Sequence, residues 1–353
     1  MTVFDDPAFD DHELVTFARD ATTGLSAIIA VHNTSRGPAL GGCRMWAYPD
    51  TAAAVSDALR LARGMTYKAA LAELPMGGGK SVIMGDPGRD KTPALFRSMG
   101  RAVDAVGGRY RVAEDVGIDV ADVAEMATET AHVAGMPVKD SDGDPSPATA
   151  YGVFHGMRAA VRHRFGRDTL DGLRVGVQGA GAVGEKLVPY LVADGAHVTI
   201  ADLDAARARQ VAERDGVDMC GVDDILAAPV DILSPCALGA VLNDETIPTI
   251  RAGIIAGAAN NQLGEDRHGA ALEARGILYA PDYAINSGGI IHISHEGPDY
   301  DRQRAFAHVA RIGETITEIF DRAAQTGEPP ATAADRLAET RFTHPNPGIA
   351  RAR

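Results

Sequence analysis

The sequence predicts an α/β protein of two domains, one of them built on a parallel sheet covered by helices. Three observations carry this prediction. The chain has 353 residues, and an average domain has roughly 150. Through its second half, short apolar runs alternate with helical stretches. A motif of the form GxGxxG, with glycines at 179, 181 and 184, directly follows one of these apolar runs.

The composition excludes several classes of partner. Lys and Arg number 34 against 48 Asp and Glu, a net charge of −14, with no basic stretch. We therefore expect no nucleic acid and no membrane as a partner, because both require a positive protein surface. The three cysteines, at 43, 220 and 236, are widely spaced, which indicates free thiols in a reducing compartment. With no apolar run long enough to span a bilayer, these features predict a soluble, cytoplasmic protein, and no metal site is expected.

The first part of the chain mixes strands and helices. Residues 23–31 (TGLSAIIAV) are strand-like, and 80–84 (KSVIM) predict a short buried strand. Residues 52–68 predict a helix, because apolar residues recur on one face at a spacing of three to four; they are Val55, Ala58, Leu59, Ala62 and Met65.

An acidic segment at 138–147 (VKDSDGDPSP) then interrupts the pattern. It contains glycine and proline and almost no apolar residue, which is typical of an interdomain hinge. We predict a substrate-binding and oligomerisation domain at 1–140, joined by the C-terminal helix at 331–353, and a dinucleotide-binding domain at 145–330.

The second domain is predicted from a strand–helix alternation that begins after a helix at 151–165. Helical stretches follow at 302–324 and 331–342. Strands that alternate with helices favour a parallel sheet covered on both faces. The strand-like runs are 173–177, 197–200, 231–233, 253–255 and 277–280.

The glycine motif predicts a Rossmann-type dinucleotide site. Residues 173–184 read LRVGVQGAGAVG, in which the glycines permit a tight turn, close approach of pyrophosphate and close helix–strand packing. About 20 residues further on, Asp202 ends the next strand, where its carboxylate would bind the adenine ribose and repel a 2′-phosphate. The pattern therefore favours NAD, although the nearby Arg207 and Arg209 leave NADP open. The assigned residues are Gly179, Ala180, Gly181, Ala182, Val183, Gly184 and Asp202.

Two lysines mark a second candidate site. Lys68 ends a predicted helix and Lys80 follows three glycines, which indicate an unusual backbone path or close approach of a ligand. An ATP-binding P-loop is excluded, because Leu74 stands where that motif requires glycine. One ammonium group could pair with a substrate carboxylate while the other, desolvated and near a like charge, serves as a general base. The alternative is that both are solvated surface lysines.

Seven motifs together resemble the leucine dehydrogenase branch of the Glu/Leu/Phe/Val amino-acid dehydrogenase family. They occur in the family's order and span nearly the whole chain. They are GPALGGCRMW (37–46), GMTYK (64–68), GGGK (77–80), AEDVG (113–117), PCALGA (235–240), AGAANNQL (256–263) and YAPDYAINSGG (279–289).

This resemblance implies the roles of individual residues. Lys68 would bind the substrate carboxylate, Lys80 would be the general base, and Asp115 would assist proton transfer near the amino group. Asn261 would contact the substrate. The nicotinamide end would be lined by Ser146, Thr149, Ala237, Leu238, Ala259 and Asn260. The family also implies a site in the cleft between two domains, and homo-oligomers from dimer to octamer.

The implied activity is reversible NAD-dependent oxidative deamination of an L-amino acid to a 2-oxo acid and ammonia. Neutral Lys80 would take a proton from water as that water attacks the iminium carbon. In the family, the substrate side chain packs on residues that match Leu40, Ala113, Ile290 and Ile293. An apolar lining excludes a carboxylate side chain, and two isoleucines favour branched-chain, leucine-type substrates.

Two alternatives stay open. One is a phenylalanine dehydrogenase of the same family. The other is a non-catalytic dinucleotide-binding sensor, which predicts loss of Lys68, Lys80 or Asp115, and all three are present.

Overall fold

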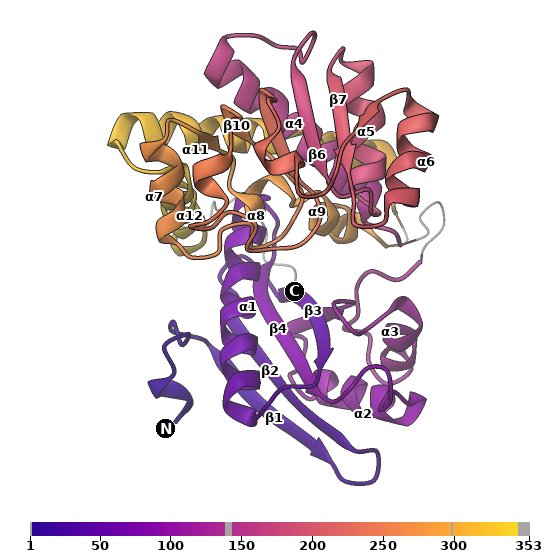
Figure 1. The fold of residues 1–353 in the computed structure, drawn as a ribbon. Helices are drawn as coiled ribbons and strands as arrows, with labels where there is room; N and C mark the ends of the chain where they lie inside the picture. Colours follow the sequence, from indigo (N-terminus) through magenta and orange to yellow (C-terminus); the bar gives the residue numbers. More distant parts are fainter. Residues whose placement is uncertain (1, 138–142, 298, 345–353) are drawn as a thin grey trace. The chain divides into compact units, whose positions relative to one another are not determined.

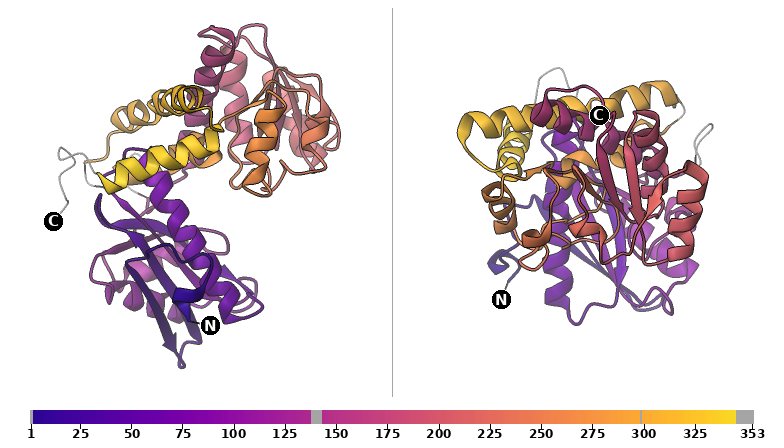
Figure 2. Two further views of the ribbon diagram at one scale, coloured as in Figure 1. Left: turned by 90° about the vertical axis from the view of Figure 1, so that its left-hand side faces the viewer. Right: turned by 45° about the horizontal axis from the view of Figure 1, so that its top comes forward.

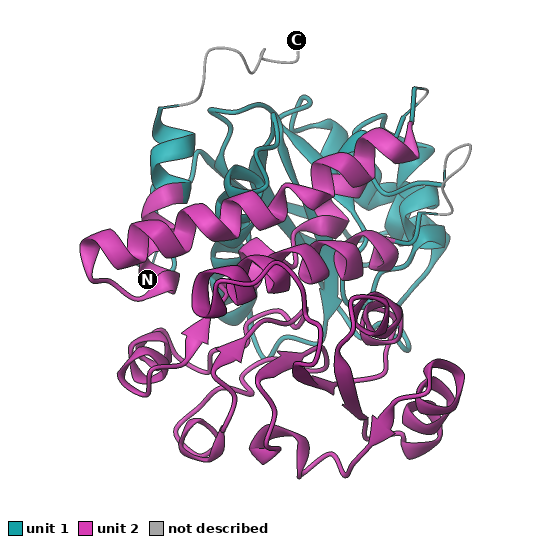
Figure 3. Cartoon of the chain, turned by 90° about the horizontal axis from the view of Figure 1, so that it is seen from above, with its two compact units in different colours: residues 1–144, 293–300, 338–353 teal, residues 145–292, 301–337 magenta. Residues whose placement is uncertain are grey.

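The computed structural model describes residues 2–137, 143–297 and 299–344 (Figure 1). The chain divides into two compact units (Figure 3). Unit 1 comprises Met1–Asp144, Ile293–Tyr300 and Ala338–Arg353, and unit 2 comprises Pro145–His292 and Asp301–Leu337. Of the segments predicted above, 138–142 of the hinge and 345–353 of the C-terminal segment lie outside the described residues.

Unit 1 is built on a mixed five-stranded sheet in the order β1-β2-β4-β3-β5. β2 pairs antiparallel with β1 and with β4, whereas β3 runs parallel to both β4 and β5. The strand predicted at 80–84 begins earlier, because the three glycines before Lys80 also pair with the neighbouring strands. The strands are β1 (Leu14–Asp20), β2 (Leu25–Asn33), β3 (Ala39–Trp46), β4 (Gly77–Met84) and β5 (Tyr110–Ala113).

Helices cover both faces of this sheet, because alternate residues of each strand are apolar on opposite sides. Helix α1 (Thr51–Leu71) buries its apolar stripe against Ile28 and Val82. Helices α2 (Pro93–Asp104) and α3 (Val120–Ala127) cover the other face, where Ile29 and Ile83 lie. Figure 1 shows α1 and the α2–α3 pair on either side of the strands.

Two buried histidines connect the N-terminal segment and β2 to α1. His12 Nε2 donates to the carbonyl of Leu59 at 3.0 Å, and His32 Nδ1 is hydrogen-bonded to Thr66 Oγ1 at 2.8 Å. The ring centroids lie 4.8 Å apart, so protonation of both imidazoles would place two positive charges close together and is unfavourable. Burial lowers the pKa of His12, and burial together with His12 lowers the pKa of His32 to about 4.

This pair predicts acid lability of unit 1. An unfolded histidine binds its proton near pH 6.5, whereas folded His32 binds one only near pH 4. The unfolded state therefore binds more protons between these values, and stability is lost as the pH falls through that window. Between pH 7 and pH 4.5, we expect the fall in the free energy of unfolding to be about 2–3 kcal/mol smaller in His32→Gln than in the wild type. Urea titrations across this range measure the difference, and parallel pH profiles would contradict it.

Unit 2 contains a six-stranded sheet in the order β11-β10-β9-β6-β7-β8, in which every pairing is parallel. Counted from β6, this is the order of a doubly wound dinucleotide-binding fold, as the sequence predicted. Strand β8 was missed, because it has only two residues and both are exposed. The strands are β6 (Arg174–Gln178), β7 (His197–Ala201), β8 (Asp218–Met219), β9 (Ile232–Pro235), β10 (Ile254–Ile255) and β11 (Leu278–Tyr279).

Helices surround the unit 2 sheet (Figure 2). The helical stretch predicted at 302–324 consists of two helices, because Arg311 ends one helix and begins the next. The helices that begin in this unit are α4 (Ser146–Phe165), α5 (Gly184–Ala193), α6 (Ala205–Asp215), α7 (Arg267–Ala274), α8 (Asp282–Ile285), α9 (Gly288–His295), α10 (Arg302–Ala310), α11 (Ile312–Thr326) and α12 (Pro330–Thr343). None of the described helices is long and apolar enough to cross a membrane.

The end of α12 packs within unit 1. The Arg341 guanidinium donates to the carbonyl of Leu71 at 2.9 Å, at the last turn of α1. The ring of Phe342 meets Tyr67 edge-on at 5.4 Å between centroids. These contacts hold the last turn of α1, which carries Lys68, in place.

Candidate active site

Lys80 lies in β4 on the face that α1 covers. Side chains alternate along a strand, so Lys80 shares a face with Gly78 and Val82, and Val82 packs in the core beneath α1. The Lys80 side chain is 5% exposed. Burial lowers its pKa, although Asp115 acts in the opposite direction. A lysine that is buried and paired with one carboxylate is unlike the solvated surface lysine that the sequence left open.

Asp115, just beyond β5, faces Lys80. Its Oδ2 atom lies 2.9 Å from Lys80 Nζ. Burial acts to raise the pKa of Asp115, but Lys80 and Arg44 outweigh it, and the net effect is a lowered pKa. The carboxylate is thus held ionised beside the lysine.

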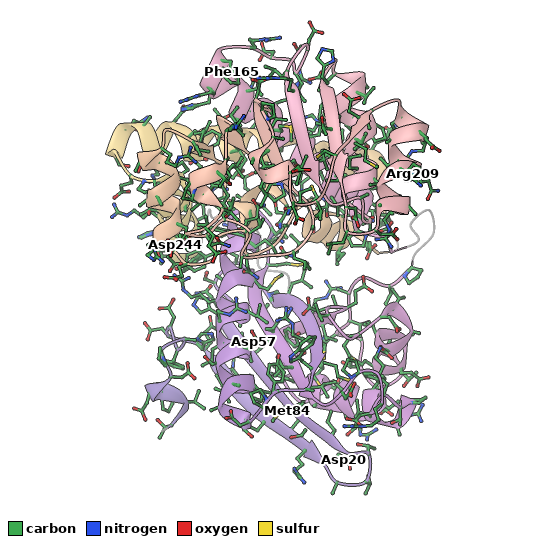
Figure 4. The ribbon with its side chains drawn as sticks, viewed as in Figure 1. Asp20, Asp57, Met84, Phe165, Arg209 and Asp244 are labelled. Atoms are coloured by element: carbon green, nitrogen blue, oxygen red, sulfur yellow. The ribbon has the colours of Figure 1, made fainter. Side chains whose placement is uncertain are left out.

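Arg44 of β3 is the residue of this cluster that the sequence analysis missed. Its Nε donates to Asp115 Oδ2 at 2.9 Å, and its Nη1 donates to Asp57 Oδ2 at 3.0 Å. Asp57 projects from α1 and is labelled in Figure 4. One signal was available, because Arg44 is the only charged residue in the run ALGGCRMW at 39–46, and a charge in a buried strand is paired as a rule.

The three glycines before Lys80 are explained by close packing. Their backbone does not enter the left-handed region, so the expectation of an unusual path was wrong. A Cβ on Gly78 would lie 2.0 Å from the backbone nitrogen of Thr66, and one on Gly77 would lie 1.8 Å from the carbonyl oxygen of Asn33. The absence of side chains lets α1 approach β4 at Thr66, two residues before Lys68. Lys68 is partly buried in the last turn of that helix.

Three of the four predicted side-chain pocket residues belong to unit 1. Leu40 and Ala113 are buried in the paired strands β3 and β5. A Cβ on Gly135 would lie 3.9 Å from both the Ala113 methyl carbon and Ile293 Cδ1, so these two side chains border the same point. Ile290, one turn earlier in α9, is buried and belongs to unit 2.

The predicted dinucleotide-binding residues of unit 2 follow the carboxyl ends of its strands. Residues 179–184 follow β6, Asp202 follows β7, 237–238 follow β9 and 259–260 follow β10, with the predicted substrate contact Asn261 next in the same loop. Because the sheet is parallel, all these ends lie at one edge. β6 and β9 are neighbours although β7 and β8 separate them in sequence, so the glycine loop lies at the point where the strand order reverses, the usual ligand position in such sheets.

The glycine loop has the shape that a pyrophosphate group requires. Gly179 has a φ of +108°, and a Cβ there would lie 2.9 Å from the backbone of Cys236. A Cβ on Gly184 would lie 1.9 Å from the carbonyl oxygen of Gly179. At Gly181, by contrast, a Cβ would meet no heavy atom of the described chain within 4 Å. Two glycines thus close the loop on itself, while the middle one leaves space beside the start of α5, where backbone N–H groups bind anions.

Asp202 braces this loop. Its Oδ2 accepts the N–H of Ala180 at 2.7 Å, and its Oδ1 accepts the N–H of Asp204 at 2.8 Å. A carboxylate has about four lone-pair positions, so both oxygens can still accept from ribose hydroxyl groups. Arg207 and Arg209 of α6 are exposed; Arg209 is labelled in Figure 4.

The loops after β9 and β10 hold each other in strained conformations. Ala240 and Asn261 both adopt left-handed backbone angles, with φ of +56° and +50°, and the Ala240 N–H donates to the carbonyl of Asn261 at 2.6 Å. Asn286 Nδ2 donates to Asn260 Oδ1 at 2.7 Å, a contact that the sequence analysis did not anticipate. Strained non-glycine residues cluster at ligand sites, and Ala237, Leu238, Ala259, Asn260 and Asn261 all belong to these loops.

The first turn of α4 carries the other two predicted nicotinamide contacts. Ser146 is buried. Thr149 Oγ1 donates to the carbonyl of Pro145 at 3.0 Å and lies 2.9 Å from where a Cβ on Gly289 would stand. The start of α9 therefore packs tightly on this turn.

Comparison with known proteins identifies two family regions in the chain. Residues 12–132 match the model described as Glu/Leu/Phe/Val dehydrogenase, dimerisation domain. Residues 199–333 match the model described as Glutamate/Leucine/Phenylalanine/Valine dehydrogenase.

Individual relatives match over almost the full length. Leucine dehydrogenase of Bacillus cereus is 48% identical over 333 residues, which cover 94% of this chain and 91% of that protein. Phenylalanine dehydrogenase of Thermoactinomyces intermedius is 47% identical over 334 residues, covering 94% and 91%. The crystal structure of L-tryptophan dehydrogenase from Nostoc punctiforme superposes with a TM-score of 0.86 at 42% identity, covering 94% of this chain and 96% of that one. The chain therefore belongs to the Glu/Leu/Phe/Val dehydrogenase family.

Proposed function

We propose that this protein catalyses the reversible NAD-dependent oxidative deamination of branched-chain, leucine-type L-amino acids to the 2-oxo acid, ammonia and NADH. The observation that carries this proposal is the buried ion pair of Lys80 and Asp115, 2.9 Å apart. A bound nicotinamide dinucleotide supplies the hydride acceptor. The chain's own residues bind and orient the amino acid and move protons.

Lys80 serves as the general base. Burial lowers its pKa, which increases the neutral fraction available near neutral pH. Neutral Lys80 removes a proton from the water that attacks the substrate Cα once hydride has left. Asp115, ionised at rest, takes a proton from the substrate ammonium group and later returns a proton to the amino group before ammonia departs.

The remaining substrate contacts are assigned by chemistry. Lys68 pairs with the substrate carboxylate, and Asn261 contacts the same molecule through its amide. Leu40, Ala113, Ile290 and Ile293 form an apolar lining. This lining disfavours glutamate, because nothing in it would compensate the desolvation of a second carboxylate. Relatives named leucine and phenylalanine dehydrogenase are almost equally similar to the chain, so the preference for leucine rests on the two isoleucines.

We assign NAD as the cofactor on the basis of Asp202. Its carboxylate lies where the adenine ribose is bound in this fold, and its charge would repel the 2′-phosphate of NADP. Gly179, Ala180, Gly181, Ala182, Val183 and Gly184 hold the pyrophosphate. The residues that line the nicotinamide end are Ser146, Thr149, Ala237, Leu238, Ala259 and Asn260.

The glycine loop gives a test of this assignment that is independent of turnover. Gly181→Val places a side chain in free space, so we expect wild-type thermal stability but NADH affinity reduced by at least about tenfold, because the pyrophosphate loses its space. Gly184→Ala meets backbone at 1.9 Å and should lower both. Calorimetric NADH binding and melting curves distinguish the two variants. Wild-type NADH affinity in Gly181→Val would contradict the assignment.

The activity itself is tested by following NADH production with leucine, valine, isoleucine, phenylalanine and glutamate side by side, repeated with NADP. We expect the highest kcat/KM with a branched-chain substrate and NAD. Preference among apolar side chains should be modest, since one methylene contributes about 1–3 kcal/mol. A higher kcat/KM for phenylalanine would establish the alternative within the family, and NADH binding without turnover of any amino acid would indicate a sensor.

We also propose that the protein is a cytoplasmic homo-oligomer. The family model that matches residues 12–132 is described as a dimerisation domain, and Cys43, Cys220 and Cys236 are free thiols, as expected in a reducing compartment. Sedimentation equilibrium gives the number of subunits, and a monomer at micromolar concentration would contradict the proposal.

A further inference from the structure

We propose that Arg44, anchored by Asp57, is a positioning residue that holds one oxygen of Asp115 beside Lys80 and leaves the other directed to the substrate amino group. The inference rests on the proposed function, because it takes Lys80 and Asp115 as the groups that handle protons. It adds two further charged residues, Arg44 and Asp57, that orient these groups.

The hydrogen bonds to Asp115 are one-sided. Lys80 Nζ and Arg44 Nε both lie 2.9 Å from the same oxygen, Oδ2. The other oxygen, Oδ1, makes no hydrogen bond or ion pair with any residue of the described ranges. The side chain is 24% exposed, so the carboxylate reaches the edge of the core. Two cations on one oxygen fix the plane of the carboxylate and leave Oδ1 available to an incoming ammonium group.

Arg44 can impose this orientation because its own guanidinium is fixed on the far side. Nη1 donates to Asp57 Oδ2 at 3.0 Å, and the same oxygen accepts the Tyr48 hydroxyl at 2.7 Å. Arg60 donates to the second oxygen of Asp57 at 2.8 Å. Arg44 and Asp57 are only 21% and 17% exposed, so the opposite charge of each helps the other to be tolerated away from water. The result is a row of alternating charges from Lys80 through Asp115 and Arg44 to Asp57.

The row also affects the ionisation of Lys80. Burial lowers the lysine pKa, Asp115 raises it and the positive charge of Arg44 lowers it. Because Asp115 Oδ2 is shared between two cations, it stabilises the Lys80 ammonium less than an unshared carboxylate would. Cys43, on the other face of β3, is buried with its pKa raised to about 12, so it stays a neutral thiol.

Arginine is required at this position by geometry. Its planar fork donates along two directions at once, whereas a lysine presents a single point charge. A lysine at 44 would keep the positive charge but could not hold Asp115 and Asp57 together. Arg44→Lys therefore separates the effect of charge from the effect of orientation.

The test compares Arg44→Met, Arg44→Lys and the matched control Arg97→Met in the full-length protein with NAD and leucine. Arg97 also pairs with a carboxylate in unit 1, Glu125 at 2.6 Å, but takes no part in the site. For Arg44→Met we expect kcat to fall about 10²-fold, as a misplaced catalytic group does. The rising limb of kcat against pH should move to higher pH, and NADH affinity should not change. Arg44→Lys should keep the limb near its wild-type position with kcat still at least about tenfold lower, and Arg97→Met should match the wild type.

Crystal structures of the variants report on the inference without any activity. We expect the Asp115 carboxylate to rotate or lose its single orientation in both Arg44 variants. Wild-type kcat and pH profile in Arg44→Met, or an unchanged Asp115 in its structure, would overturn the inference. If Arg44→Met does not fold, Arg44→Lys serves as the test, and a wild-type kcat in that variant would also overturn the inference. Wild-type protein that turns over no amino acid would instead refute the proposed function, while the orientation of Asp115 would still test Arg44.

Discussion

Replacement of Lys80 by alanine is expected to lower kcat by about 10²- to 10⁴-fold, the range that a general base contributes. The physical reason is that the lysine is buried and ion-paired, with its Nζ atom 2.9 Å from Asp115. No other described amine is placed on Asp115 in this way, so water must attack the substrate without a base. Steady-state rates with leucine and NAD measure the loss.

The Lys80→Ala variant should still bind NADH with wild-type affinity, because the glycine loop belongs to unit 2. Truncation also leaves Asp115 with only Arg44 as a partner, so melting curves are needed to show that the fold is intact. A stable variant with normal turnover would refute the role assigned to Lys80.

Replacement of Gly78 by alanine is expected to damage both stability and activity. The added methyl group would lie 2.0 Å from the Thr66 nitrogen and 2.4 Å from its Cα. Both are backbone atoms of a helix, which cannot give way as the end of a flexible side chain can. Helix α1 must therefore shift away from β4, at a cost of about 3 kcal/mol or more, at the upper end of overpacking. Because Lys68 is two residues from Thr66, we also expect KM for the amino acid to rise.

Gly64 offers a matched control in the same helix. An added Cβ there meets no heavy atom of the described chain within 4 Å. Since glycine weakens a helix interior, Gly64→Ala should be neutral or stabilising by about 0.5–1 kcal/mol. Urea unfolding of the two variants gives the comparison. Equal stability of Gly78→Ala and Gly64→Ala would show that α1 does not rest on β4 as described.

Local signals explain why the dinucleotide-binding half was predictable. The strand, the glycines, the helix and Asp202 lie within 30 residues of one another, at 173–202, and each has a short-range physical cause. The strand–helix alternation then implied the parallel sheet. What failed was also local: β8 is too short and too exposed to show a pattern, and the break at Arg311 is marked only by Gly313 in the first turn of the next helix, a weak signal because a single glycine is tolerated in a helical pattern.

The lysine site was predictable only in part. Lys68, Lys80 and Asp115 stood out through motifs, but nothing in their spacing indicated which groups they touch. The three glycines were interpreted as a sign of an unusual backbone path or of close approach of a ligand, and neither reading anticipated helix packing. The closeness of Gly78 to the Thr66 backbone shows that packing of α1 on β4 requires glycine there.

For this protein, the sequence alone predicted the parallel sheet and the glycine loop of unit 2, because these follow from patterns between near neighbours, and family motifs marked Lys80 and Asp115 as the candidates for proton transfer. The tertiary structure alone decided how those residues are held. Arg44, Asp57, Lys80 and Asp115 come from β3, α1, β4 and the segment after β5, and they meet only because β3 pairs with both β4 and β5 while α1 covers the same face. Burial then leaves these charges to be balanced mainly by one another, with Tyr48 and Arg60 as further partners of Asp57, and that dependence has no trace in the order of the residues.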